Sequence, residues 1–265
     1  MKILKITLAL ILSLSILSCE SDDDSEFATD ATGAINLKFD NSVGHSDFIF
    51  GSTYSKSNDE SYTIETLKYI VSDIQLTKND GSVYEYPFED NIFIIDEADT
   101  TSGGVIVNLE GVDAADYTGI TFGIGVSQER FLLGAEGQGS FLDTAQEEGM
   151  FWAWASGYKF IRLDGTYAPT PSEADSNALN IHMGSVGTSI DNYKTVSLSF
   201  PNTVIVGEDQ TPDVHIVADI SKIFDGTTTA NFADGYDQVH MNETETGVIA
   251  ENISQMFMVH HVHNE

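Results

Sequence analysis

Histidine is the residue type in this sequence best suited to binding a metal ion, because imidazole nitrogens are ligands of copper, zinc, nickel and iron. The chain of 265 residues contains seven histidines: His45, His182, His215, His240, His260, His261 and His263. The last three lie in FMVHHVHNE. If this stretch is helical, His260 and His263 share a face, and if it is extended, His261 and His263 do. Either geometry offers two imidazoles to one metal ion, and the alternative is a solvated end without an ordered role.

Two of the histidines lie in predicted strands whose pattern turns them away from the core. Apolar residues alternate with His182 in NALNIHMG and flank His215 in DVHIVADI, so both imidazoles are expected on the polar face. Neither then has a role in core packing, which favours metal binding. His240, in the segment HMN, is a further candidate ligand. The methionines beside these histidines are expected to fill the core rather than to bind metal.

Both tryptophans of the chain lie one residue apart, in GMFWAWASGYKFIRLDG at positions 149–165. On a regular strand, Trp152 and Trp154 would project together from one face, with small or apolar residues on the other. One interpretation is a large aromatic anchor in a β core. The other is a pair of aromatic side chains with a functional role.

No motif in the sequence indicates an enzyme, so we expect none, and the net charge argues against nucleic acid as a partner. GxSxG, HExxH, CxxC and a phosphate-binding glycine loop are all missing from the sequence. With 42 acidic and 11 basic residues, the formal net charge is −31. Such a chain has no basic patch to neutralise phosphates. It attracts cations and basic protein surfaces instead.

The first residues read as an export signal. Two lysines precede an apolar run that is too short to span a bilayer, and the run ends at Cys19, the only cysteine of the chain. This pattern resembles a bacterial lipoprotein signal: residues 1–18 would be removed and Cys19 acylated. Residues 19–32 would form an acidic tether. ESDDDSE, directly after Cys19, resembles the export signal of Bacteroidetes-type surface lipoproteins. We therefore expect a lipid-anchored protein on the outer face of an outer membrane, with its periplasmic face as the alternative.

The remaining residues, 33–265, predict an all-β protein. Segments with alternating polar and apolar residues recur between Gly, Asp and Asn turns, and the long helical crossovers of parallel sheets are missing. We expect one antiparallel β-sandwich or Greek-key-like domain with short peripheral helices. DISKIFDG predicts one such helix, with Asp219 or Ser221 as its cap. NETETGVIAENISQMFMVHHV predicts a C-terminal helical segment that passes into a strand near its end.

The tryptophan block resembles the signature of the MbnP-like proteins, a copper-binding family named after its member in methanobactin gene clusters. Four other segments agree in order: TIETLKYIVSDIQLTKNDGS, YTGITFGIGV, LNIHMGS and DVHIVADISKIFDG. The resemblance covers nearly the whole chain after the tether. His182 and His215 fall within matching segments, and His240 fits a later position. Asn41 stands where relatives have a histidine.

The resemblance implies a β-sandwich without enzyme activity of its own that binds copper through histidines. It also implies that Trp154 or Trp152 is oxidised to kynurenine by a di-haem partner of the MauG type. Copper acquisition or storage outside the cytoplasm is therefore the expected function. The rival is a glycan- or protein-binding surface module in which the tryptophans only pack or stack.

Overall fold

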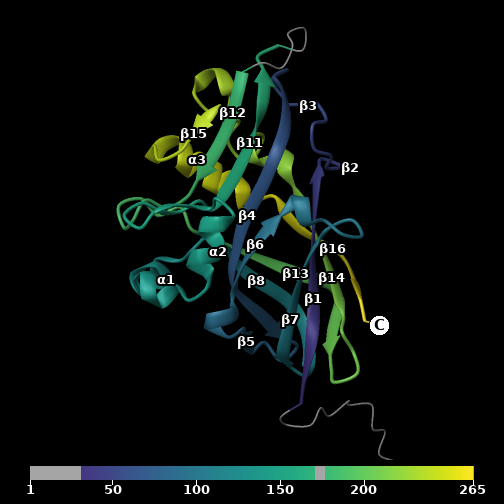
Figure 1. Cartoon of the computed structure of the whole chain (residues 1–265). Coiled ribbons are helices and arrows are strands. Elements are labelled where there is room, and N and C mark those ends of the chain that lie inside the picture. The colour runs from purple at the N-terminus through teal and green to yellow at the C-terminus, as the bar shows by residue number, and fades with distance from the viewer. Residues whose placement is uncertain (1–30, 171–176, 265) are drawn as a thin grey trace, which may run out of the picture.

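The computed structural model describes residues 31–170 and 177–264, and strands dominate them (Figure 1). The predicted signal peptide, Cys19 and nearly all of the predicted tether lie outside the described residues. The first strand begins at Thr32, the last position of the predicted tether. Within the described residues, no helix is both long and apolar enough to cross a bilayer.

The first sheet is built around β1 (Thr32–Val43). On one side, β1 pairs in parallel with β14 (Asp213–Asp219), which in turn pairs antiparallel with β16 (Phe257–His263). On the other side, β1 pairs antiparallel with β7 (Val105–Asp113). The two-residue strand β2 (Ser46–Asp47) folds back on the end of β1. This sheet places the first and last strands of the described chain two positions apart.

The second sheet is built around the 18-residue strand β4 (Ser61–Lys78). Its order is β13 (Lys194–Val206), β8 (Ala115–Ile124), β4, β11 (Ile161–Ala168), β12 (Asn177–Met183) and β15 (Gln238–Val239). Three shorter strands also pair with β4: β3 (Tyr54–Ser55), β5 (Val83–Glu85) and β6 (Ile92–Asp96). The pairing of β4 is irregular around Asp73, whose φ is 50°.

The core lies between the two sheets, and its residues follow the predicted alternation. Every second residue of β1 from Ile35 to Phe39 is fully buried. The Phe39 ring makes edge-on contacts with aromatic rings of the second sheet and of the last strand, at centroid distances of 6.0–6.5 Å. These partners are Tyr69, Phe122 and Phe257. Burial of such side chains provides the main driving force for closing the sandwich.

The prediction of an all-β, sandwich-like domain is confirmed, but the sheets are mixed rather than antiparallel. β1 pairs in parallel with β14, and β12 pairs in parallel with β15. Alternation predicts that a segment is extended and which face it buries, but not the direction of its neighbour. Short turns force antiparallel pairing only between consecutive strands, and neither of these pairs is consecutive.

Helices are short and lie at the periphery, as expected. The α-helices are α1 (Gln128–Leu132), α2 (Phe141–Glu147) and α3 (Glu243–Ile253). The 3₁₀ helices are η1 (Phe88–Asp90), η2 (Glu97–Asp99), η3 (Ala135–Gln138), η4 (Ile220–Ile223) and η5 (Phe232–Asp234). Asp219 caps η4 by accepting a hydrogen bond from the Ser221 amide. The predicted C-terminal helix ends at Ile253, and the chain then continues as β16.

The two sheets are joined at one edge by a side chain. Asn264, directly after β16, accepts a hydrogen bond from the Ile205 amide (2.9 Å) and donates one to the Thr203 carbonyl oxygen (2.8 Å). Both partners belong to β13, the edge strand of the second sheet. Asn264 therefore fixes the end of β16, the strand that carries three of the histidines.

Candidate metal centre

Three histidines converge on the outer face of the first sheet. Nitrogen atoms of His215, on β14, and of His260 and His261, on β16, all lie within 4.8 Å of one another. Nδ1 of His215 lies 3.4 Å from Nε2 of His261, and Nδ1 of His260 lies 2.7 Å from Nδ1 of His261. The two contacts use different nitrogens of the His261 ring, but one nitrogen from each ring can be chosen so that all three lie within 4.8 Å, which makes them candidate ligands of one small ion.

A β-bulge brings the consecutive residues His260 and His261 to the same place. In the pairing of β14 with β16, His215 lies opposite His261 while Ile216 lies opposite Val259. His260 is therefore an extra residue on β16. In a regular strand, neighbouring side chains point to opposite faces, and a bulge re-aims one of them. The irregularity thus adds His260 to the face that already carries His261.

His263 extends the cluster along the same strand. Its ring centroid lies 4.7 Å from that of His261. It pairs with Asp213 at the start of β14 and is exposed. Four imidazoles therefore line the outer face of β14 and β16, and we call His215, His260, His261 and His263 the C-terminal histidine cluster.

Asp40 supports the cluster from the neighbouring strand. Its Oδ2 lies 2.8 Å from Nε2 of His215. This contact orients the ring and leaves Nδ1 of His215 on the side of His261. A carboxylate bonded to the second nitrogen of a ligand imidazole is a common support of metal sites. Asp40 was not among the residues predicted from the sequence. Its place on the outer face follows from the alternation of β1, but its neighbour depends on the parallel pairing with β14.

The surroundings keep His261 in the form that binds metal. Burial lowers the pKa of the His261 imidazole, and the charges of nearby side chains lower it further. These side chains are His215, His263, His260 and Lys38. A lowered pKa means that the imidazole is already neutral at a pH where an ordinary histidine is partly protonated. Metal ions bind the neutral ring.

His182 and His240 form a separate pair on the second sheet. Their ring centroids lie 5.2 Å apart. Nε2 of His182 lies 2.6 Å from Oδ1 of Asp164, whose other oxygen accepts a hydrogen bond from Nε of Arg162 at 2.8 Å. Burial, His182 and Lys159 lower the pKa of His240. The predicted ligands therefore divide between two places, and the seventh histidine, His45, is exposed in the turn after β1.

The tryptophans do not form the anchor of a β core. The strand β9 (Phe151–Ala153) contains only Trp152, and Trp154 lies in the turn that leads to β10 (Gly157–Tyr158). The expected alternation therefore stops before Trp154, and both side chains are only partly buried. The indole of Trp154 instead stacks on the ring of Phe131 in α1, with centroids 5.0 Å apart and planes 14° from parallel.

Gly184 allows the end of β12 to lie directly against the hairpin that carries the tryptophans. This glycine follows β12 in the segment HMGS, and a Cβ atom there would lie 2.0 Å from the carbonyl oxygen of Tyr158. Only glycine allows the end of β12 to approach β10 so closely. The hairpin that carries the tryptophans is therefore positioned by the strand that carries His182.

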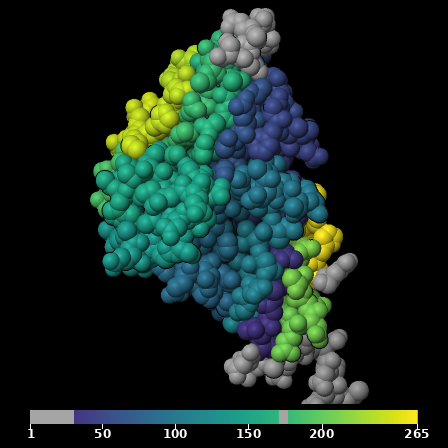
Figure 2. All heavy atoms as spheres, in the orientation of Figure 1, coloured from purple at the N-terminus to yellow at the C-terminus, as the bar shows by residue number. Residues whose placement is uncertain are grey.

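The tryptophan hairpin and the C-terminal histidine cluster lie on different sides of the molecule. α1, which packs on Trp154, and the C-terminal end of β16 are at opposite sides of Figure 1. In Figure 2, the residues around α1 and α2 form a lobe on one side, and the last residues reach the surface on the other. Among the described residues, no ring contact joins either indole to a histidine.

Comparison with known proteins gives a family match and a distant structural one. The model of the MbnP family matches residues 32–243. MbnP from Methylosinus trichosporium superposes with a TM-score of 0.45 and 14% identity, over 75% of this chain and 80% of that chain. A search of the curated proteins finds no match. The family match includes both tryptophans, His182, His215 and His240, and it ends before His260.

Proposed function

This chain belongs to the MbnP family, whose model matches residues 32–243, and from that premise we propose that it binds copper outside the cytoplasm, for acquisition or storage. The observation that carries the proposal is the convergence of His215, His260 and His261, whose nitrogens lie within 4.8 Å of one another. Two of these three ligands lie beyond the family match. The geometry of this chain therefore supports the ligand set, and the family supports the choice of metal.

The cluster fits a copper ion in distance and in donor type. Imidazole nitrogens bind metals such as zinc at about 2.0 Å, so two nitrogens on one ion lie at most about 4 Å apart. With one nitrogen taken from each ring, the three candidate donors lie within 4.8 Å of one another, less than about 1 Å beyond this limit. Among divalent first-row metals, Cu²⁺ binds such nitrogen sites most tightly.

The chain's own residues contribute binding and orientation. His215, His260 and His261 hold the ion as neutral rings, and Asp40 fixes the ring of His215. The cluster lies on the outer face of a sheet and is partly exposed. An ion held there is accessible to a donor or acceptor of copper, as acquisition or storage requires.

Copper titration of point variants tests this function. In His261→Ala we expect the affinity for copper to fall by more than the about 10–100-fold that is typical of losing a supporting residue, because a ligand itself is lost. The matched control is His45→Ala, which removes an exposed imidazole outside both histidine groups and should bind as the wild type does. The proposal is wrong if the purified protein takes up no copper, or if both variants bind alike.

Oxidation of a tryptophan is a second, separate proposal. Trp154 is partly exposed and stacked on Phe131, and such closely spaced aromatic rings can pass electrons from an indole to an oxidised di-haem partner of the MauG type. In this step, O2 or two molecules of hydrogen peroxide used by the partner would add two oxygen atoms across the broken C2–C3 bond of the indole of Trp154 or Trp152. Hydrolysis would then release C2 as formate, so the residue gains one oxygen and loses one carbon overall. Mass spectrometry of the peptide holding both tryptophans, from protein made in its native host, tests this step. An unmodified peptide rejects it without affecting the C-terminal histidine cluster.

Anchoring to the membrane through an acylated Cys19 completes the proposal. In Cys19→Ala, we expect the protein to leave the membrane fraction, since one acylated residue tethers the chain without spanning the bilayer. Added protease would digest a surface-exposed form in intact cells and spare a form on the periplasmic face.

The rival function, capture of a glycan on the tryptophans, has less support. Sugars stack on open aromatic faces, and Phe131 already covers one face of Trp154. A glycan array in which Trp154→Ala abolishes a specific signal would reverse this preference.

A further inference from the structure

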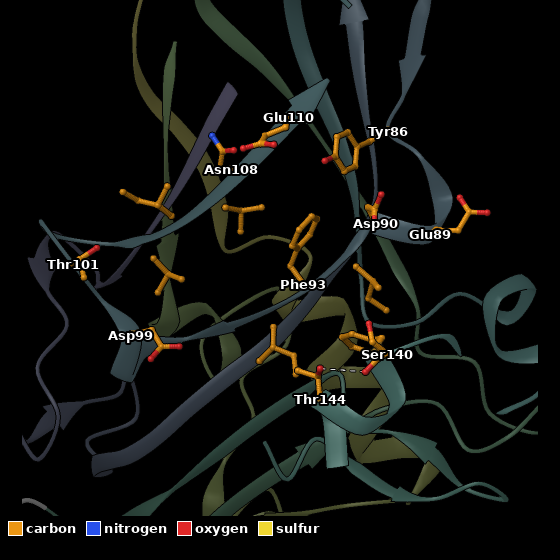
Figure 3. Close-up of a pocket in the computed structure, with 16 residues that line it drawn as sticks. Tyr86, Glu89, Asp90, Phe93, Asp99, Thr101, Asn108, Glu110, Ser140 and Thr144 are labelled. Carbon is orange, nitrogen blue, oxygen red and sulfur yellow. Dashed lines mark hydrogen bonds between the residues drawn. The ribbon is translucent and has the colours of Figure 1, made fainter. Parts of the chain in front are cut away.

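The sandwich is open between β6 and β7, at the edge away from Asn264. A groove of about 900 Å³ lies there, with α2 at one side. In Figure 3, Phe93 on β6 projects into the space below β7. Asp99 and Thr101 lie where the two strands are connected, and Tyr86 and Glu110 lie toward the opposite end. The volume is near the upper limit of ordinary ligand pockets.

Two strand edges without strand partners border this groove. Within the described residues, β7 pairs only with β1, and β6 pairs only with β4. Each strand therefore has one side whose amides and carbonyls make no ladder. The Tyr84 hydroxyl donates to the Gly111 carbonyl oxygen and covers the far end of β7. The open edge is thus the stretch Val105–Leu109, long enough for a short extended peptide to pair with it.

The lining of the groove combines an apolar floor with an acidic rim. Ile92, Phe93, Val105, Val107 and Phe141 contribute apolar surface. The carboxylates at the rim belong to Glu89, Asp90, Asp99 and Glu110, and no lysine, arginine or histidine lines the groove. Ile106 beside them is 48% exposed. A ligand that covers the apolar floor also comes close to these carboxylates. It would therefore need positive charge at the rim to compensate them.

We propose that this groove binds an extended, cationic segment of a partner protein as an added strand along β7. Side chains of a strand alternate between faces. Those of the added strand that point inward would meet Phe93 and Phe141, and those that point outward would lie along Asn108 and Glu110. The segment should therefore alternate apolar residues with lysine or arginine. Backbone pairing supplies affinity in this mode, and the alternate side chains supply specificity.

Edge protection is the competing explanation of the acidic rim. Charged side chains keep exposed strand edges from pairing with other chains. A purely protective edge needs only the charges, however, whereas here a wide groove lies beside the edge, and Ile92 and Phe93 are partly exposed in it. The C-terminal histidine cluster lies on β14 and β16 and does not line the groove, so the inference does not depend on copper binding.

A synthetic heptapeptide of alternating lysine and valine is a suitable probe, measured by fluorescence anisotropy with the full chain in the presence of a chelator. We expect saturable binding that Glu110→Lys weakens at least tenfold. Glu208→Lys is the matched control: it makes the same change of charge at an exposed residue of the turn after β13, outside the groove. Its affinity should be that of the wild type.

Backbone pairing is tested with the same peptide methylated on alternate amide nitrogens, in both registers. Methylation keeps every charge and removes the donors on one edge. We expect one register to bind at least tenfold more weakly, and bound peptide to slow hydrogen exchange at amides within Val105–Leu109. Absence of binding, equal effects of Glu110→Lys and Glu208→Lys, or equal affinity of all three peptides would overturn the proposal.

Discussion

At the scale of single residues, Asp40 shows how a carboxylate outside the ligand set shapes the site. It bonds Nε2 of His215 and so determines which nitrogen of that ring faces His261. In Asp40→Asn, we expect the affinity for copper to fall by about 10–100-fold, the usual effect of losing such a support. Competition titration with a copper chelator measures it. Asp209→Asn, at an exposed carboxylate of the turn after β13, is the control, and an equal loss there would mean that only overall charge matters.

The lowered pKa of His261 has a consequence for pH dependence. Because the folded protein disfavours the protonated ring, the unfolded chain binds this proton more readily in the range just below the ordinary histidine pKa. The contribution of His261 to stability is therefore complete above that ordinary value and is lost as the pH falls below it. An NMR titration of the metal-free protein should give His261 a lower midpoint in the folded protein than in the urea-unfolded chain. A higher midpoint in the folded protein would contradict the role of its neighbours.

At the scale of elements, the bulge in β16 explains why the ligand set could be predicted only in part. An extended C-terminal strand places His261 and His263 on one face, as the sequence indicates, and His260 on the other. The extra residue between His261 and Val259 moves His260 to the same face. Nothing in FMVHHVHNE marks a bulge, because it depends on how β16 meets β14. The end of the short strand β9 was equally unpredictable. The alternation of aromatic residues with alanine continues through Trp154, but the strand ends at Ala153.

Substitution of alanine for two glycines, Gly184 after β12 and Gly247 in α3, should change the free energy of unfolding in opposite directions. Gly184→Ala places a methyl group against the Tyr158 carbonyl oxygen, and we expect it to lower the free energy of unfolding by about 1–3 kcal/mol. Gly247 lies in α3 with open space around its Cβ position, so Gly247→Ala should raise it by about 0.5–1 kcal/mol through helix propensity. Urea denaturation measures both. Similar effects of the two changes would contradict the packing of β12 on β10.

At the scale of the whole molecule, Asn264 connects closure of the sandwich to the C-terminal histidine cluster. Asn264→Ala removes two hydrogen bonds between the sheets, each worth about 0.5–1.5 kcal/mol. We expect a lower denaturation midpoint and faster hydrogen exchange in β16. Asn264→Asp keeps the acceptor for the Ile205 amide and should show a smaller effect. If the alanine variant exchanges as slowly as the wild type, β16 is fixed by its pairing with β14 alone.

The overall architecture was more predictable than the site. Alternating segments identified the strands and the buried face of β1, and Asp219 capped a short helix as expected. Asp164 and Asp40, in contrast, acquire their histidine partners through pairing between β11 and β12 and between β1 and β14. Such pairings depend on which distant strands meet, and no local pattern encodes them. For the same reason, the sequence did not separate His182 and His240 from the C-terminal histidine cluster.

The order of the first sheet has a consequence for the stage of biosynthesis at which the C-terminal histidine cluster can form. β14 lies between β1 and β16, so the sheet combines the first and the last of the described strands. A nascent chain that has reached α3 already carries the tryptophan hairpin but lacks three of the four clustered imidazoles. The cluster can therefore assemble only after β16 has been synthesised and has paired with β14, and a product that ends before β16 would have the tryptophan hairpin without the cluster.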